Sequence, residues 1–209
     1  MILHDYWRSS AAYRVRIGLA LKGVAYESVS HDLRAGEQKL PSYRSTAPQG
    51  LIPALEQDGQ VLTQSLAILE WLDETHPTPA FLPADPAGRA RVRALAYVVA
   101  LDIHPVNNLR ILKALKADFG AEQPAIDAWV RHWIADGFAA LEQMAGDDPY
   151  LSGDAPGLAD ICLVPQWYNA ERFALDTTPY PKLAAIVARA NALPGFAAAH
   201  PSRHPHATD

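Results

Sequence analysis

The first third of the chain alternates between strand-like segments and segments whose apolar residues have helical spacing. Residues 2 to 7 (ILHDYW) form a short strand-like run, and in residues 13 to 23 (YRVRIGLALKG) Val15 and Leu19 lie four positions apart before a glycine that would end a helix. Residues 25 to 30 (AYESVS) return to strand-like composition. These patterns predict a strand, a helix and a second strand.

The next segment predicts a polar helix over residues 36 to 46 and a β-hairpin within residues 51 to 65 (LIPALEQDGQVLTQS). An Asp-Gly pair joins the two short apolar runs of this hairpin, so the region has a β-α-β-α-β-β order. Pro53 stands where the first hairpin strand begins, a position at which a sheet tolerates proline. A cis peptide between Ile52 and Pro53 would turn backbone groups outward to face a ligand.

A proline-rich segment, residues 77 to 88, separates this region from one whose patterns are helical. Asp85 and Pro86 suit an N-cap and the first position of a helix. The sequence therefore predicts an α/β domain over residues 1 to 80 and an all-helical domain over residues 86 to 209, ending in a loosely ordered polar tail. The helical stripes comprise Val92, Leu95, Val99 and Ile103, and then Ile126, Trp129, Val130, Trp133, Phe138 and Leu141.

Composition and charge narrow the setting. The 209 residues are 49% hydrophobic, with 18 basic and 23 acidic residues that are scattered along the chain, so we expect a globular protein that binds no nucleic acid. We find no leader-like start and no apolar run of membrane-spanning length, which favours a cytoplasmic protein without membrane contact. The single cysteine, Cys162, lies in an apolar stripe and is therefore expected to be an inert core residue. No residue cluster predicts a metal, and no Gly-rich loop predicts a nucleotide.

Four segments together resemble the zeta-class glutathione transferases, a family that includes maleylpyruvate and maleylacetoacetate isomerases. They are SSAAYRVRIGLALKG, APQGLIPALEQDGQVLTQSLAILEWLDE, DIHPVNNLRILKAL and GLADICLVPQWYNAERFALDTTPYP. The resemblance implies a thioredoxin-like N-terminal domain, an all-α C-terminal domain and a homodimer. It also implies glutathione as cofactor and a small dicarboxylate substrate, whose cis double bond is isomerised to trans.

Such an isomerisation needs a nucleophile that adds to the double bond, lets it rotate, and leaves again. A thiolate suits both steps, but a free thiol has a pKa of about 8.5, so helix-terminal N-H groups and a hydroxyl donor should stabilise the anion. Ser9 and Ser10, at the start of the first predicted helix, are the expected donors. The alternative is that Ser9 only caps the helix. Ala11 replaces a cysteine usual in the family, which leaves glutathione-dependent isomerisation intact but not side reactions of that thiol.

Further glutathione contacts follow from the resemblance. Gln64 and Ser65 should hold the γ-glutamyl end at a helix N-terminus, although Ser65 could instead serve as a helix cap. Ile52 should offer main-chain bonds, and Gln38 should meet the glycyl carboxylate. Near the glutathione, the resemblance also places Ala11, Asp102, His104 and Asn108.

Two sequence features qualify these expectations for the helical domain. His104 and Asn108 are four positions apart and should share a helix face that Pro105 kinks. Whether their contacts reach the partner subunit's site is open, and the alternative for His104 is a purely structural role. Asp160 matches a helix-capping aspartate, but Gly157 replaces the serine or threonine of the usual capping box, so Asp160 is expected to be structural.

The dicarboxylate substrate requires counter-charges, and arginine pairs with carboxylates in a bidentate manner. Arg8, Arg110 and Arg172 match the arginines expected around such a site, with solvated helix faces as the alternative for the last two. Other functions also remain open: a general glutathione transferase, an α-haloacid dehalogenase, or a non-catalytic transferase-like binding protein. Maleylpyruvate and maleylacetoacetate are not distinguished as substrates.

Overall fold

The computed structural model describes residues 1 to 207, and they form two compact units. The first contains residues 1 to 80 together with 192 to 207, and the second contains residues 81 to 191. The change of unit near residue 80 coincides with the predicted linker. Residues 192 to 207 belong with the first unit, which the division of the sequence into consecutive domains did not anticipate.

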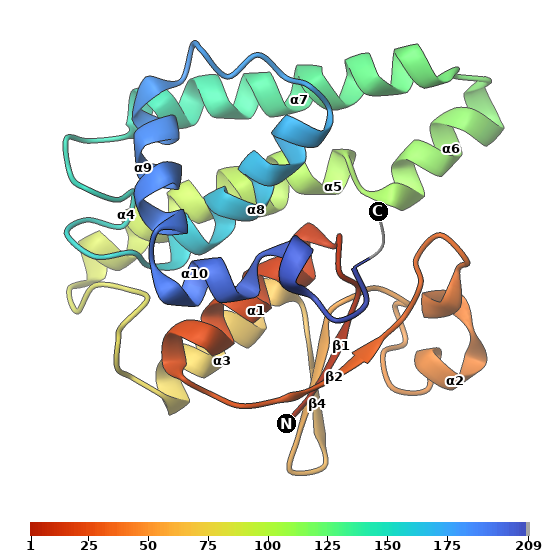
Figure 1. The fold of residues 1–209 in the computed structure, drawn as a ribbon, viewed down its shortest axis with the longest axis horizontal. Helices are drawn as coiled ribbons and strands as arrows, with labels where there is room; N and C mark the ends of the chain where they lie inside the picture. The colour runs from red at the N-terminus through yellow and green to blue at the C-terminus, as the bar shows by residue number, and fades with distance from the viewer. Residues whose placement is uncertain (208–209) are drawn as a thin grey trace. The chain divides into compact units, whose positions relative to one another are not determined.

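The first unit is built on a four-stranded mixed sheet (Figure 1). The strand order is β2-β1-β3-β4, with β1 and β2 parallel and the other pairs antiparallel. The Asp-Gly pair forms the predicted hairpin turn, because both residues have the positive φ angles, 50° and 77°, that a tight hairpin requires. The strands are β1 (Ile2–Asp5), β2 (Glu27–Ser30), β3 (Ala54–Gln57) and β4 (Gln60–Thr63).

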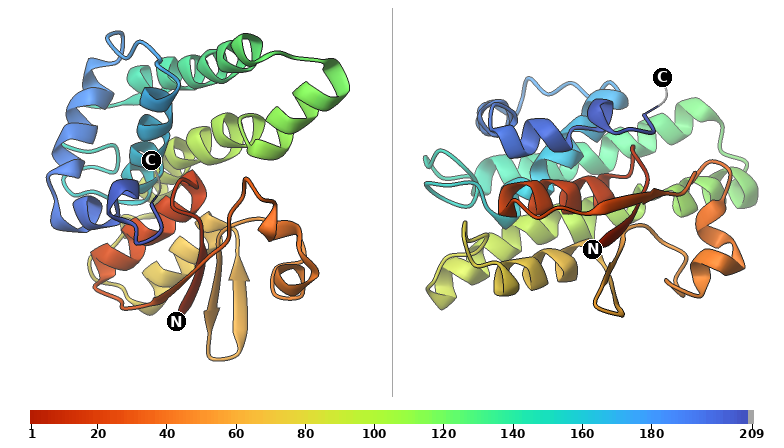
Figure 2. Two further views of the ribbon diagram at one scale, coloured as in Figure 1. Left: turned by 45° about the vertical axis from the view of Figure 1, so that its right-hand side comes forward. Right: turned by 60° about the horizontal axis from the view of Figure 1, so that its bottom comes forward.

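Helices cover both faces of this sheet. α1 (Ser10–Lys22), α3 (Ser65–Thr75) and α10 (Pro194–Ala199) lie on one face and α2 (Pro41–Arg44) on the other (Figure 2). α1 packs against both α3 and α10, and for this reason it is buried from Ala11 through Leu19. A β-carbon at Gly195 would lie 2.9 Å from the Leu21 side chain, so the small residue permits the close approach of α10 to α1.

Two predictions for this unit are wrong. Residues 36 to 46 do not form one helix: a 3-10 turn, Glu37–Lys39, is separated from α2 by Leu40, whose ψ of 146° is extended. The cause is Pro41, since a residue that precedes proline is driven out of helical conformation. The polar tail is also not loosely ordered up to residue 207, because Pro201–Arg203 form a 3-10 turn and His204 is only 8% exposed. Its last two positions, 208 and 209, lie outside the described residues.

The second unit is entirely helical, as predicted. Its first helix begins where expected, because Asp85 accepts the Gly88 N-H at 2.8 Å ahead of Pro86. The first apolar stripe is buried, and Cys162 is fully buried as well. The helices are α4 (Pro86–Tyr97), a π-helical continuation (Val98–Ile103), α5 (His104–Val106), α6 (Leu109–Phe119), α7 (Gln123–Met144), α8 (Leu158–Arg172) and α9 (Pro181–Asn191).

The start of α8 confirms the structural role of Asp160. This fully buried carboxylate accepts the N-H groups of Leu151, Ser152 and Gly157 at 2.8 to 3.2 Å. Burial raises the pKa of Asp160, and these bonds only partly oppose the rise. Gly157 has no side chain to complete the box, so the Ser152 hydroxyl accepts the Ala159 N-H at 3.3 Å. The missing half of the cap therefore comes from a residue upstream of the helix.

Candidate active site

Ser9 lies at the junction between β1 and α1 and is the N-cap of α1. Its Oγ accepts the Ala12 N-H at 3.2 Å, which confirms the capping interaction. A hydroxyl that accepts one hydrogen bond still has its own proton to donate, so capping leaves Ser9 able to act on a ligand. Ser9 and the neighbouring Ser10 are both partly exposed at the positive end of the helix dipole.

Arg8 precedes these serines and lies against Trp7. The Arg8 guanidinium carbon is 4.6 Å from the centroid of the Trp7 ring, a distance at which a cation is attracted to the ring face. Trp7 is buried, whereas Arg8 is partly exposed. The buried indole thus provides a fixed platform for a cation one residue before the N-cap.

The start of α3 differs from that of α1. Ser65 is its first helical residue and therefore not its cap, and at the cap position Gln64 makes no side-chain capping bond to any described residue. Gln64 has a φ of 69°, a strained value for a residue other than glycine. The Ser65 hydroxyl accepts a hydrogen bond from Arg14 Nη1 at 3.2 Å, and both side chains are buried. The first N-H groups of α3 thus have backbone geometry that suits an anionic group.

A fixed loop joins these elements to Gln38 and Ile52. The peptide between Ile52 and Pro53 is cis, which is the conformation that would turn backbone groups toward a ligand. Lys39 Nζ donates to the Gly50 carbonyl at 2.8 Å, and a β-carbon at Gly50 would lie 2.7 Å from the Gln38 carbonyl oxygen. The buried Gln38 side chain has an amide oxygen without a hydrogen-bond partner among residues 1 to 207. The structure therefore brings the segments of Gln38 and Ile52 together.

The same loop also reaches the start of α3. Gln64 Nε2 donates to Gln49 Oε1 at 2.8 Å, and the Tyr43 hydroxyl donates to the Leu51 carbonyl at 2.7 Å. Burial raises the pKa of Tyr43 above its ordinary value, so this phenol keeps its proton and remains a donor at neutral pH. Residues from the 3-10 turn, the cis-proline loop and the start of α3 thus form one continuous polar network.

The second unit places Asp102, His104, Asn108 and Arg110 in one stretch, but it corrects their predicted geometry. His104 and Asn108 do not share a helix face, because α5 ends at Val106 and Asn108 has an extended ψ of 144°. Asn108 is instead the N-cap of α6, and its side-chain oxygen accepts the Arg110 N-H at 3.1 Å. A new helix therefore begins after Asn108.

The two predicted arginines of the second unit are exposed and belong to different helices. Arg110 is in the first turn of α6, and Arg172 ends α8, where its Nη1 donates to Asn169 Oδ1 at 3.1 Å. Arg172 also lies 5.8 Å from the Phe173 ring centroid. Arg8 is in the first unit, so the convergence of the three arginines on one substrate stays a prediction.

Sequence reasoning did not identify the buried arginines of α1 as part of this region. Arg14 and Arg16 are only 2% and 3% exposed, and Arg14 supports Ser65 directly. Two charged residues within the otherwise apolar run YRVRIGLAL were the available signal. A buried arginine requires partners, so such a pattern predicts polar contacts that cross the core.

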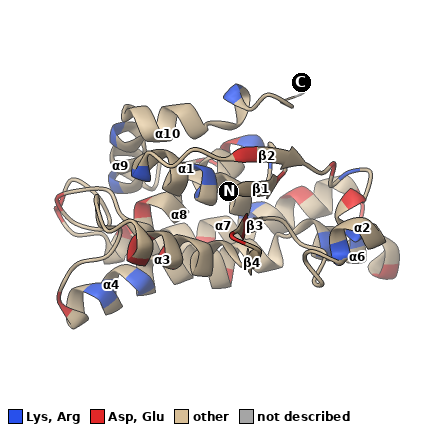
Figure 3. Ribbon diagram, turned by 90° about the horizontal axis from the view of Figure 1, so that it is seen from below, with Lys and Arg blue, Asp and Glu red and all other residues tan. Residues whose placement is uncertain are grey.

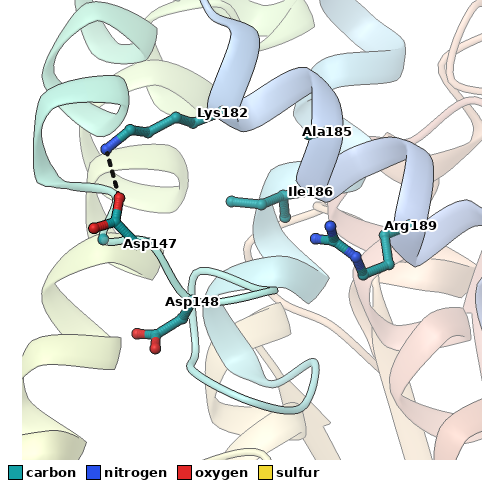
Figure 4. Close-up of a pocket in the computed structure, with 7 residues that line it drawn as sticks. Asp147, Asp148, Lys182, Ala185, Ile186 and Arg189 are labelled. Carbon is teal, nitrogen blue, oxygen red and sulfur yellow. Dashed lines mark ion pairs between the residues drawn. The ribbon is translucent and has the colours of Figure 1, made fainter.

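One surface pocket of the second unit contains none of the predicted site residues (Figure 4). Lys182 Nζ lies 3.6 Å from Asp147 Oδ1 at its rim, and Arg189 and Asp148 add one further charge of each sign. The nearly balanced, exposed charges give this pocket no clear preference for an anionic ligand.

Charge is otherwise distributed over the helices, although α6 is visibly basic (Figure 3). Within residues 1 to 207, no group of three or more His, Cys, Asp or Glu side chains is arranged to hold a metal ion. No helix of that same range has the length and hydropathy to cross a bilayer.

Comparison with known proteins assigns the family. Residues 1–74 match the family model "Glutathione S-transferase, N-terminal domain" and residues 123–189 match "Glutathione S-transferase, C-terminal domain". The chain is 49% identical to maleylpyruvate isomerase from a Ralstonia species, over 98% of this chain and 99% of that protein.

Two solved structures cover 100% of both chains. One is a holo structure of a zeta-class bacterial maleylpyruvate isomerase, with a TM-score of 0.97 and 48% identity. The other is maleylacetoacetate isomerase from Methylobacterium extorquens with bound malonate and GSH, with a TM-score of 0.96 and 41% identity. The chain therefore belongs to the glutathione S-transferase family and, within it, to the zeta class.

Proposed function

We propose that the protein is a glutathione-dependent cis-trans isomerase that converts maleylpyruvate to fumarylpyruvate or maleylacetoacetate to fumarylacetoacetate in aromatic catabolism. The observation that carries the proposal is the Ser9 hydroxyl, which caps α1 and keeps a proton to donate at the helix N-terminus. The 49% identity to a maleylpyruvate isomerase over nearly the whole chain supports the same reaction.

The residues of the first unit fit glutathione. An anion-accepting start of α3 at Gln64 and Ser65 suits the γ-glutamyl carboxylate, and the cis-proline loop presents the Ile52 main chain nearby. Gln38, tied to the same loop through Gly50, suits the glycyl end. Ala11 follows the two serines in α1 and provides only a small, buried surface beside them.

Bound glutathione supplies a thiolate that adds reversibly to the conjugated double bond and so allows rotation about it. The Ser9 hydroxyl would donate a hydrogen bond to this sulfur, and Ser10 and the following N-H groups would contribute the positive end of the α1 dipole. The effect of these donors is to hold the thiol in its anionic form at neutral pH. Cys162 takes no part, since it is fully buried in the second unit.

The arginines carry the proposed substrate contacts. Arg8, fixed on the Trp7 ring, would pair with a carboxylate next to the reacting carbon, and Arg110 and Arg172 would pair with the remaining anionic groups. Enolate charge that develops as sulfur adds would be stabilised by the same guanidinium groups, so their loss should lower turnover as well as binding. Asp102, His104 and Asn108 are further candidate glutathione contacts from the second unit.

We further infer a homodimer and a cytoplasmic setting, in keeping with the family and with the free cysteine. Sedimentation or light scattering of the purified protein tests the dimer. A monomer that retains full isomerase activity would contradict it.

The function is tested by following the loss of maleylpyruvate absorbance with purified protein, with and without glutathione, and then repeating the assay with maleylacetoacetate. Strictly glutathione-dependent turnover of either compound is expected, and the ratio of the two kcat/KM values identifies the preferred substrate. Turnover of neither compound by protein that binds glutathione would refute the proposal in favour of a general transferase. An aryl chloride and an α-haloacid are the control substrates for that outcome.

A further inference from the structure

A buried charged cluster links the C-terminal segment of the chain to the loop that carries Arg8 and Ser9. Its centre is Asp5, the last residue of β1, which is fully buried. Asp5 Oδ1 accepts from Arg16 Nη1 at 2.7 Å and from the Tyr6 N-H at 2.6 Å, and Asp5 Oδ2 lies 3.1 Å from His204 Nε2. The Asp5 carboxylate is thus in contact with His204, a residue 199 positions further along the chain.

Arg16 connects this cluster to two backbone segments. Its Nη2 donates to the Trp7 carbonyl at 3.0 Å, and its Nε donates to the Ala199 carbonyl at 3.2 Å. The Trp7 carbonyl belongs to the peptide that precedes Arg8, and the Ser9 N-H donates to the Tyr6 carbonyl at 2.9 Å. One buried guanidinium therefore holds the β1-α1 loop and the end of α10 at the same time.

The hydrogen bonds of His204 identify its tautomer. Nδ1 accepts the His206 N-H at 3.2 Å, so that nitrogen carries no proton. The proton of the neutral ring is therefore on Nε2, which faces Asp5 Oδ2 and donates to it. His204 is 8% exposed and so supplies a fixed, desolvated donor to the carboxylate that orients Arg16.

We propose that His204 is a positioning residue for the active site: through Asp5 and Arg16 it fixes the Trp7 peptide, and thereby the orientation of Arg8 and Ser9. This inference rests on the proposed function, because Arg8 and Ser9 are catalytic residues only in that proposal. His204 itself touches neither the cofactor nor the substrate. Its role is to complete the set of donors around Asp5, which then holds Arg16 in a single arrangement.

The test compares His204→Ala with His204→Gln in the full-length protein. A glutamine amide reaches the Nε2 position and restores a donor to Asp5, whereas alanine does not. His206→Ala is the matched control, since it removes a neighbouring exposed imidazole but keeps the backbone N-H that contacts His204. If His204→Ala does not fold, His204→Asn replaces it, because its shorter amide reaches the Nδ1 position but not Nε2.

Three measurements are made on each variant: kcat and KM for glutathione, the ultraviolet thiolate absorbance of bound glutathione at neutral pH, and amide hydrogen exchange of residues 6 to 10. We expect His204→Ala to lower kcat/KM about tenfold or more, as misplacement of catalytic groups does. We also expect it to weaken the thiolate absorbance and to speed exchange in the loop. His204→Gln should largely restore all three, and His206→Ala should change none of them.

Two negative results have different meanings. Wild-type thiolate absorbance and loop exchange in His204→Ala, in an enzyme that isomerises its substrate, would overturn the positioning role alone. A wild-type protein without glutathione-dependent turnover would instead refute the proposed function, and with it the catalytic meaning of the loop.

Discussion

The Ser9 hydroxyl accepts the Ala12 N-H at 3.2 Å, so the proposed catalytic donor is also the cap of its own helix. The two roles require different properties: a cap needs an acceptor oxygen, whereas thiolate stabilisation needs a proton. Aspartate is as good a cap as serine but, when ionised, has no proton to donate. This difference allows the two roles to be separated experimentally.

We predict that the free energy of unfolding of Ser9→Asp lies within about 1 kcal/mol of the wild-type value. The same substitution should lower kcat by about a hundredfold or more, because it removes a donor and places a negative charge beside the thiolate. Ser9→Ala should lose both activity and about 1 kcal/mol of stability. Calorimetry and the isomerase assay check the pair, and an active Ser9→Asp would exclude Ser9 as the donor.

Arg14 Nη1 and the Ser65 hydroxyl form the buried contact between α1 and the start of α3. Ser65→Ala removes the acceptor of this buried, charge-assisted hydrogen bond, so we expect a loss of about 1.5 to 3 kcal/mol in the free energy of unfolding. We also expect the Kd for glutathione to rise about tenfold, which corresponds to about 1.4 kcal/mol of binding free energy. Urea unfolding and titration calorimetry measure the two effects.

Ser45→Ala is the matched control for that substitution, because the Ser45 hydroxyl donates to the Ser42 carbonyl at an exposed position. Ser45→Ala should alter neither the free energy of unfolding nor the affinity for glutathione. Equal effects of both substitutions on glutathione affinity would show that the Ser65 contact has no specific role in binding.

Asp5 should make stability depend on pH in the acid range. Burial alone would raise the pKa of Asp5, but the hydrogen bond from His204 and the charge of Arg16 outweigh it and hold the pKa below its ordinary value of 3.8. As the pH falls through about 3.8, the unfolded chain takes up the proton first. The stabilisation by ionised Asp5 is thus complete above that pH and is lost as the pH falls through the lower, folded-state value.

Asp5→Asn removes this contribution at all pH values and leaves Arg16 without its ion pair, so it should destabilise the protein by about 3 to 5 kcal/mol near neutral pH. The difference from wild type should narrow as the pH is lowered from about 6 to about 3. Urea midpoints measured across that range provide the check. A difference that stays constant or widens would contradict the assigned sign of the pKa shift.

Gly157 offers a test of a substitution toward the family pattern. A serine at this position has the side chain that the capping box of Asp160 requires. However, a β-carbon there would collide with the Phe81 carbonyl oxygen and lie 2.9 Å from the Ser152 hydroxyl oxygen. We therefore expect Gly157→Ser to lower stability by about 1 to 3 kcal/mol, as overpacking does. Thermal unfolding measures this, and a rise in melting temperature would show that the contact relaxes without difficulty.

Local chemistry made much of the fold predictable from sequence. The Asp-Gly turn and the Asp85-Pro86 helix start depend on residues adjacent in sequence, and both are confirmed. The sequence marked Pro53 as a position where a cis bond could occur, and the bond is cis. The helix predicted over residues 36 to 46 failed for an equally local reason, the effect of Pro41 on Leu40. Pro41 stands in the sequence, so the break before it follows from the same kind of local rule.

The rest depended on contacts between distant residues, which no local pattern encodes. Nothing around His204 predicts a partner near residue 5, and HPSRHPHATD has the composition of a disordered tail. His104 and Asn108 likewise do not share the predicted helix face. The Asn108 side chain caps the next helix, and this capping favours a break in the helix over its continuation. Spacing alone does not show which of two helices an asparagine serves.

The inclusion of residues 192 to 207 in the first unit has a consequence for how the chain is made. During synthesis, β1 and α1 emerge long before residues 192 to 207. The surface of α1 that packs against α10, and the Arg16 Nε that donates to the Ala199 carbonyl, therefore wait for those contacts until residues 192 to 207 have left the ribosome. A fragment that ends near residue 80 would leave that surface exposed. The loop between β1 and α1 therefore reaches its final geometry only after residues 192 to 207 have been synthesised.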